Sequence, residues 1–134
     1  MRLVVDTGLF SASLSRRRRA RLEGLVRQMV GNQIFLAAAT VSELRYGALV
    51  AQWGEPRRQR LEHSIQATTV IPVSETLLST IAELRYACRL AGHPLHDRSH
   101  ANDLWIAASA IHIGAPLLAD DGVFDNTPGL MLHR

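Results

Sequence analysis

Short apolar runs alternate along this chain with longer segments in which apolar residues recur every three or four positions. The runs occupy residues 3–5, 34–37, 69–72, 115–119 and, more weakly, 130–132. Short apolar runs bounded by polar residues predict buried strands, while the three-to-four spacing predicts helices with one apolar face. Strands that alternate with helices tend to pair in parallel and to be covered on both faces. The pattern therefore predicts an α/β fold with a mostly parallel sheet.

Helical spacing covers residues 16–30, 40–53, 55–66, 75–90 and 99–113. Gly31 and Gly92 come soon after two of these segments, as expected for residues that end a helix. In parallel α/β folds, ligands bind beyond the carboxyl ends of the strands. Polar residues that directly follow a strand are therefore the first candidates for a functional site.

Length and composition limit the class of protein. The chain has 134 residues, of which 47% are hydrophobic and 20% charged, and this predicts one globular domain over residues 1–134. No apolar run approaches the ~20 residues of a membrane span. Asp6 follows only three apolar residues, too few for a secretory signal, so we expect a cytoplasmic protein. Cys88 is the only cysteine, which excludes an internal disulfide.

Four acidic residues lie where the fold would bring them to one edge of the sheet. Asp6 follows the first predicted strand and Asp121 the fourth, while Glu43 and Asp103 lie in the first turns of predicted helices. Carboxylates that converge repel one another, so a cluster that stays ionised at neutral pH needs a cation. Oxygen ligands of this kind suit Mg²⁺ or Mn²⁺ better than zinc. The residues thus suggest a metal site that could hydrolyse a phosphodiester.

Each acid also has a local structural interpretation. Asp6 could cap the helix that follows it, and Asp103 could complement a helix dipole. Thr40-Val41-Ser42-Glu43 reads as a capping box, and Asp120-Asp121-Gly122 as a turn. Spacing alone leaves both interpretations open for each residue.

The helical position of Glu43 gives a more specific expectation. Glu43 shares one face of its predicted helix with Tyr46, Gly47 and Val50. We expect this face to point inward, toward the other acids.

The sequences around these acids resemble a known family. In order along the chain they are Val4-Val5-Asp6-Thr7, Thr40-Val41-Ser42-Glu43-Leu44-Arg45-Tyr46-Gly47, Asn102-Asp103-Leu104-Trp105-Ile106-Ala107-Ala108 and Asp121-Gly122-Val123-Phe124. Together they resemble the four acidic motifs of PIN-domain ribonucleases, specifically of the VapC-like toxins of type II VapBC toxin–antitoxin systems. The resemblance spans nearly the whole chain and implies a three-layer α/β/α sandwich with a mostly parallel sheet of about five strands.

The same resemblance implies a function. It implies a Mg²⁺-dependent endoribonuclease, with Mn²⁺ as an alternative ion, that cleaves structured RNA such as tRNA or rRNA with metal-activated water. Asp6 and Asp103 would be the firmest metal ligands, Glu43 would help to position metal or water, and Asp121 would support a second, weaker metal. A cognate VapB-like antitoxin and a homodimer are the implied partners.

Two features depart from the family pattern or leave it ambiguous. Related sequences often carry Thr or Ser two residues before the fourth acid, where this chain has Ala119. Asp120 and Asp125 flank Asp121, so the sequence leaves open which side chain points into the cluster; Phe124, three residues after Asp121, favours Asp121. The alternative is therefore a catalytically inactive module of the same fold that binds RNA or a regulatory partner.

The basic residues point less specifically to RNA. All 15 are arginine, the net charge is +3, and Arg16, Arg17, Arg18 and Arg19 are consecutive. Guanidinium groups bind phosphate in a forked geometry, so this run could bind RNA near the acidic edge. A solvated helix start that keeps the protein soluble is an equally good interpretation.

Other motifs carry weaker alternatives. Asp6-Thr7-Gly8 matches the aspartic protease tripeptide, but those enzymes are largely β-structure. A receiver domain needs a lysine at its site, and this chain has none. His96 and His100 have metal-ligand spacing only on a helix, and their segment reads as a loop. An antitoxin groove would need exposed apolar residues such as Leu49 or Trp53, although either could lie in the core or at a dimer contact.

Overall fold

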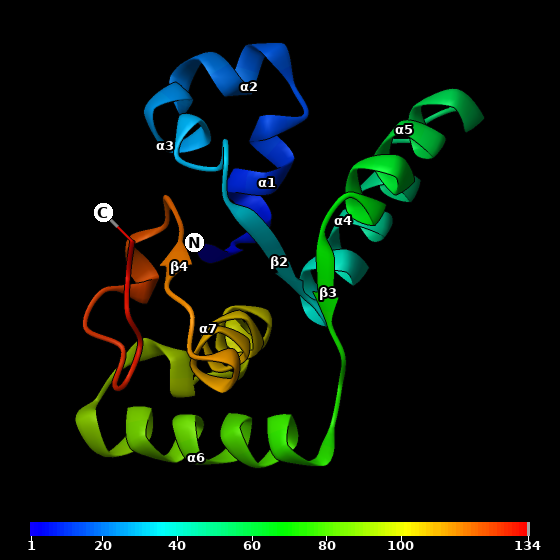
Figure 1. Ribbon diagram of the computed structural model, residues 1–134. Helices are drawn as coiled ribbons and strands as arrows, with labels where there is room; N and C mark the ends of the chain where they lie inside the picture. Colours follow the sequence, from blue (N-terminus) through cyan, green and yellow to red (C-terminus); the bar gives the residue numbers. More distant parts are fainter. Residues whose placement is uncertain (134) are drawn as a thin grey trace.

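A parallel sheet of four strands lies at the centre of the computed structural model, which describes residues 1–133 (Figure 1). The strand order is β3-β2-β1-β4, and all three pairings are parallel. The strands are β1 (Arg2–Val5), β2 (Gln33–Ala37), β3 (Thr69–Ile71) and β4 (Leu117–Leu118). The α/β prediction with a parallel sheet is thus confirmed.

The expected fifth strand is reduced to a single bridge. Leu132 pairs in parallel with Leu117 as an isolated β-bridge beside β4. The Leu117 amide donates to the Met131 carbonyl at 2.8 Å, and the His133 amide donates to the Leu117 carbonyl at 2.9 Å. A count of about five strands was therefore close, with four strands and one bridge found in residues 1–133.

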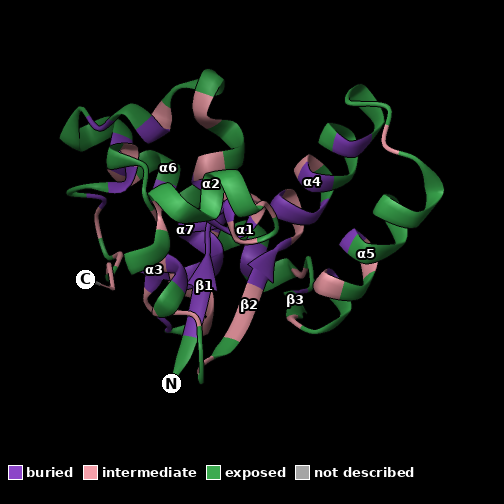
Figure 2. Cartoon of the chain, turned by 90° about the horizontal axis from the view of Figure 1, so that it is seen from above, coloured by how far each residue is buried: buried purple, intermediate pink, exposed green. Residues whose placement is uncertain are grey.

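Two apolar layers cover the sheet, one on each face. Val4 packs with the helices on one face, while Leu3 and Val5 pack with those on the other, because successive side chains of a strand point to opposite faces. One face is covered by α6 (Glu75–Ala91) and α7 (Ala101–Ile113). The other is covered by α1 (Thr7–Ser13), α3 (Glu23–Arg27), α4 (Ala38–Val50) and α5 (Glu55–Gln66). Figure 2 shows that β1 is buried over most of its length.

The predicted helix over residues 16–30 is wrong in its continuity. The chain forms two short helices instead, α2 (Arg16–Arg21) and α3, with Leu22 between them outside helical geometry at φ −110° and ψ 22°. Both segments are weak helix formers: Arg17 and Arg21 of α2 are four residues apart, where like charges destabilise a helix, and Gly24 of α3 lowers helix propensity. The break leaves α2 on the surface with no buried residue.

The other helices whose ranges were predicted lie close to those ranges. The bounds of α5 agree with the prediction. Helix α6 extends its predicted range by one residue, to Ala91, and is capped by Gly92, which has φ 69°. Short 3₁₀ helices, η1 (Pro94–His96) and η2 (Arg98–His100), precede α7, and η3 (Gly122–Phe124) follows β4. Among the described residues, no helix is long and apolar enough to cross a membrane.

Candidate metal-binding and active site

Asp6 stands at the carboxyl end of β1, in the middle of the sheet. It is the N-cap of α1, and its Oδ1 accepts a hydrogen bond from the Leu9 amide at 2.9 Å. The residue is only 5% exposed. Asp6 can therefore cap α1 and also belong to a site at the edge of the sheet, since Oδ1 caps the helix and Oδ2 is left for a ligand.

The surroundings of Asp6 oppose its negative charge. Burial is the largest cause and raises the pKa of Asp6 to about 6. The Leu9 amide acts in the opposite direction, while the carboxylates of Asp121, Asp103 and Asp120 raise the pKa further, in that order. Three acids from two other segments thus lie near enough to Asp6 to repel it.

Asp103 enters this cluster from the first turn of α7, as predicted. The side chain is partly buried, and its Oδ2 lies 3.3 Å from Nδ1 of His100. His100 ends the 3₁₀ helix η2, so the break between η2 and α7 places the imidazole beside the carboxylate. The His100 contact was not anticipated, although a His three residues before an acid at a helix start is a visible signal.

Glu43 joins the site indirectly, through a hydroxyl. Thr7 Oγ1 donates to Glu43 Oε1 at 2.9 Å and lies 3.0 Å from Thr40 Oγ1. Since Thr7 directly follows Asp6, this network ties α4 to the end of β1. The two threonines were not singled out as site residues from the sequence, because the contact depends on how α1 packs against α4.

Two expectations about Glu43 are wrong. Helix α4 begins at Ala38 with Ala37 as N-cap and no side-chain cap, so Glu43 lies beyond the first turn and forms no capping box. The face of α4 that carries Glu43 was predicted to point inward, but it points toward solvent: Tyr46 and Val50 on this face are 69% and 65% exposed. The buried face of α4 is instead formed by a different set of residues, Thr40, Val41, Leu44 and Ala48.

Asp121 follows β4 on the exposed side of the cluster. Its Oδ1 accepts from the Val123 amide at 2.9 Å, which caps η3, so the turn interpretation holds alongside the convergence. Asp120 also raises the pKa of Asp6, but Asp125 is not among the causes of that shift. Of the three adjacent acids, Asp121 has the largest effect on Asp6.

The donor set fits a hard divalent cation with few protein ligands. Within residues 1–133, no three His, Cys, Asp or Glu side chains are close enough to hold a metal ion by themselves. Mg²⁺ is commonly held by one or two carboxylates, with water completing its shell. A buried carboxylate repelled by three others supplies the excess negative charge that such an ion would neutralise.

The arginine run of residues 16–19 lies at the surface, and one of its members is hydrogen-bonded to α1. Arg18 Nη1 donates to Ser11 Oγ of α1 at 2.8 Å. Arg18 also borders a cavity of about 300 Å³ together with Arg57 and Arg60 of α5. These two arginines were not identified from the sequence. Of the residues considered for an antitoxin groove, Trp53 is partly buried against the core and Leu49 is exposed.

Comparison with known proteins agrees with the family resemblance. The chain matches the PIN domain family over residues 3–130. It is 31% identical over 123 residues to Ribonuclease VapC5 of Mycobacterium tuberculosis, a match that covers 90% of this chain and 84% of that protein. The chain therefore belongs to the PIN-domain family. Its similarity to VapC5 over most of both lengths places it among the VapC-like members of that family.

Solved structures support the same placement. VapBC2 from Rickettsia felis, crystallised with a DNA fragment from its promoter, aligns over 99% of this chain and 98% of that chain with a TM-score of 0.78 and 24% identity. VapBC-5 from Mycobacterium tuberculosis aligns over 99% and 98% with a TM-score of 0.70 and 29% identity. The match to VapBC2 shows that the two chains share a fold.

Proposed function

We propose that this protein is a metal-dependent endoribonuclease, the toxin of a VapBC-type pair, which uses Mg²⁺ or Mn²⁺ to cleave tRNA or rRNA. The observation that carries the proposal is the burial of Asp6 among three other acids at the carboxyl edge of the sheet. Without a cation this arrangement is costly, because the charged form of Asp6 is both desolvated and repelled. Similarity to a ribonuclease over most of the chain supports RNA as the substrate.

Roles for the side chains follow from their positions. Asp6 and Asp103 would hold the ion. Asp121, the carboxylate that raises the pKa of Asp6 most, would complete the negative pocket. A bound divalent ion lowers the pKa of coordinated water and polarises a phosphodiester. Glu43, held by Thr7, would orient the attacking water by accepting a hydrogen bond from it. His100 would hold the Asp103 carboxylate in position from outside the pocket.

Partners remain part of the proposal. The solved relatives named above are VapBC proteins, which supports a VapB-like antitoxin as the partner of this chain. We also propose a homodimer, which a measurement of mass in solution by light scattering would test.

Cleavage of total cellular RNA by the purified protein tests the proposal. The comparison needs wild type with Mg²⁺, wild type with EDTA, Asp6→Asn, and Glu83→Gln as a matched control. Glu83 is an exposed acid of α6, in the layer that does not carry α1 or α4, so its loss should change nothing. Discrete fragments that require metal and Asp6, but not Glu83, are the expected result.

Two other outcomes would contradict the proposal. Identical fragments from wild type and Asp6→Asn would mean that the cleavage comes from a contaminant. Absence of cleavage, together with no rise in melting temperature on adding Mg²⁺ or Mn²⁺, would favour the inactive RNA-binding or regulatory module, because a ligand that binds only the folded state must stabilise it.

A further inference from the structure

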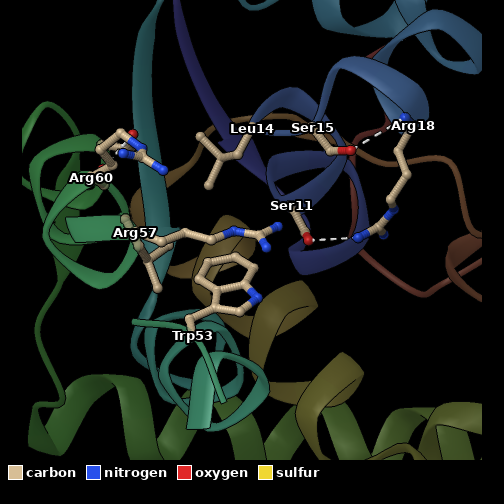
Figure 3. Close-up of a pocket in the computed structure, with 9 residues that line it drawn as sticks. Ser11, Leu14, Ser15, Arg18, Trp53, Arg57 and Arg60 are labelled. Carbon is tan, nitrogen blue, oxygen red and sulfur yellow. Dashed lines mark hydrogen bonds between the residues drawn. The ribbon is translucent and has the colours of Figure 1, made fainter. Parts of the chain in front are cut away.

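A basic cleft lies between the α1–α2 segment and α5. We define the arginine cleft as the cavity of about 300 Å³ lined by Ser11, Leu14, Ser15, Arg18, Trp53, Arg57, Arg60, Leu61 and Ser64. Figure 3 shows Arg18 on one wall and Arg57 and Arg60 on the other, with Trp53 below. Its volume is at the lower end of the range of small-ligand pockets.

The arginines of the cleft have no acidic partner among the described residues. The ion pairs of arginine within residues 1–133 join Arg27 to Glu23, Arg45 to Glu62 and Arg58 to Glu55, and none of these arginines lines the cleft. Three positive charges therefore face one cavity without a carboxylate to balance them. A cavity of this charge favours an anionic ligand.

Two of the guanidinium groups are held in place before any ligand arrives. Arg18 donates to Ser11 at 2.8 Å, and the guanidinium carbon of Arg57 lies 3.8 Å from the centre of the Trp53 ring. A stacked guanidinium keeps its plane fixed while its N–H groups stay available at the edge. Both contacts lower the entropy lost when the arginines bind a ligand.

The cleft continues the proposed active site along α1. Thr7 and Ser11 are four residues apart and so lie on one face of that helix. Thr7 binds Glu43 at the acidic edge, and Ser11 binds Arg18 in the cleft. At a rise of 1.5 Å per residue, the two hydroxyl-bearing positions are about 6 Å apart along the helix axis. A polymer with regularly spaced negative charges could therefore reach both places at once.

We propose that the arginine cleft binds a backbone phosphate of the RNA strand whose cleaved bond lies at Asp6, with Arg18, Arg57 and Arg60 as its ligands. The inference rests on the proposed ribonuclease function and deepens it. The acidic cluster repels RNA, so a phosphate site beside it would supply the attraction that keeps the strand in place. Arg16, Arg17 and Arg19 are outside the cleft lining and are not required.

Binding can be measured without cleavage. The probe is a fluorescein-labelled single-stranded RNA of about twelve nucleotides, which is long enough to span several phosphates. Fluorescence anisotropy in EDTA would give the Kd of the full-length wild type and of Arg18→Gln, Arg57→Gln and Arg60→Gln at several salt concentrations. Arg89→Gln is the matched control, since Arg89 is an exposed arginine of α6, in the opposite helical layer.

We expect each cleft variant to raise the Kd at least about threefold and to lower the slope of log K against log salt by up to about 0.7, the value for complete loss of one phosphate contact on a single strand. Arg89→Gln should change neither quantity. Arg57→Lys should restore part of the affinity, because it keeps the charge but loses the forked geometry. Melting temperatures equal to that of wild type would exclude unfolding as the cause.

Three results would overturn the inference. In the first, the Kd and the slope stay at wild-type values in all three cleft variants. In the second, Arg89→Gln weakens binding as much as they do, so that only net charge matters. In the third, RNA binding persists while binding of a labelled hexaglutamate peptide is lost, which would make the cleft a site for an acidic protein segment. Loss of cleavage in Asp6→Asn is scored separately, so failure of the cleft and failure of the nuclease proposal are distinguishable.

Discussion

Replacing Asp6 by asparagine should stabilise the metal-free protein at neutral pH. Asparagine caps helices about as well as aspartate, and its carbonyl oxygen can still accept the hydrogen bond from Leu9. The substitution therefore removes the buried charge with little change in shape. A gain in stability from changing a proposed active-site residue would show that this carboxylate is placed for function at a cost to folding.

The magnitude follows from the pKa of Asp6, which is raised from 3.8 to about 6. The folded state holds the proton more tightly than the unfolded state, so ionisation destabilises the fold as pH rises from 3.8 toward 6. At 1.36 kcal/mol for each pKa unit, the cost reaches about 3 kcal/mol above pH 7 and is about half of that near pH 5. Asp6→Asn should recover roughly these amounts at the two pH values.

Urea unfolding in EDTA at pH 7.5 and pH 5 provides the assay, with Glu83→Gln as the exposed control. Equal stability changes at the two pH values, or a loss of stability at pH 7.5, would refute the reasoning. Added Mg²⁺ should then stabilise wild type but not Asp6→Asn, because the ion gains its affinity from the charge that the variant lacks.

The remaining structural predictions concern three other positions. Thr7→Val should cost about 1 kcal/mol in urea unfolding and reduce RNA cleavage, because Glu43 loses its donor, and Thr7→Ser should restore both. His93→Leu should cost about 2–4 kcal/mol in the same assay, since the buried imidazole contacts the Asp125 carbonyl at 2.8 Å and also accepts from a backbone amide. Gly114→Ala should lower stability by about 1 kcal/mol in thermal unfolding, because Gly114 ends α7 with φ 67°, a conformation that alanine rarely adopts.

Local patterns in the sequence were sufficient to predict most of the fold. The strands and the long helices carry their periodicity within single segments, and a buried parallel strand needs an apolar run that is easily recognised. The break at Leu22 was missed because apolar residues keep helical spacing across it, although the backbone leaves helical geometry there. The start of α4 was missed because Ala37 caps it without the side-chain signal that marked Thr40.

The acids of the site were accessible from the sequence for a topological reason. Asp6 and Asp121 follow strands that are neighbours in the sheet, so parallel pairing alone brings them to one edge. The hydroxyl that holds Glu43 and the arginines of α5 could not be found in this way. Their contacts depend on how α1 packs against α4 and α5, and that packing joins residues far apart in the sequence.

The pH dependence of stability can also identify the fourth acid of the site. Asp121 and Asp120 are both exposed, and both raise the pKa of Asp6, but Asp121 does so more strongly. Asp121→Asn should therefore bring the pKa of Asp6 closer to its ordinary value than Asp120→Asn does, and asparagine can still accept from the Val123 amide. The pKa of Asp6 in each variant can be measured by NMR titration of its carboxyl carbon in EDTA. A larger effect from Asp120→Asn would assign the fourth position to Asp120 instead, and RNA cleavage by the two variants should then follow the same order.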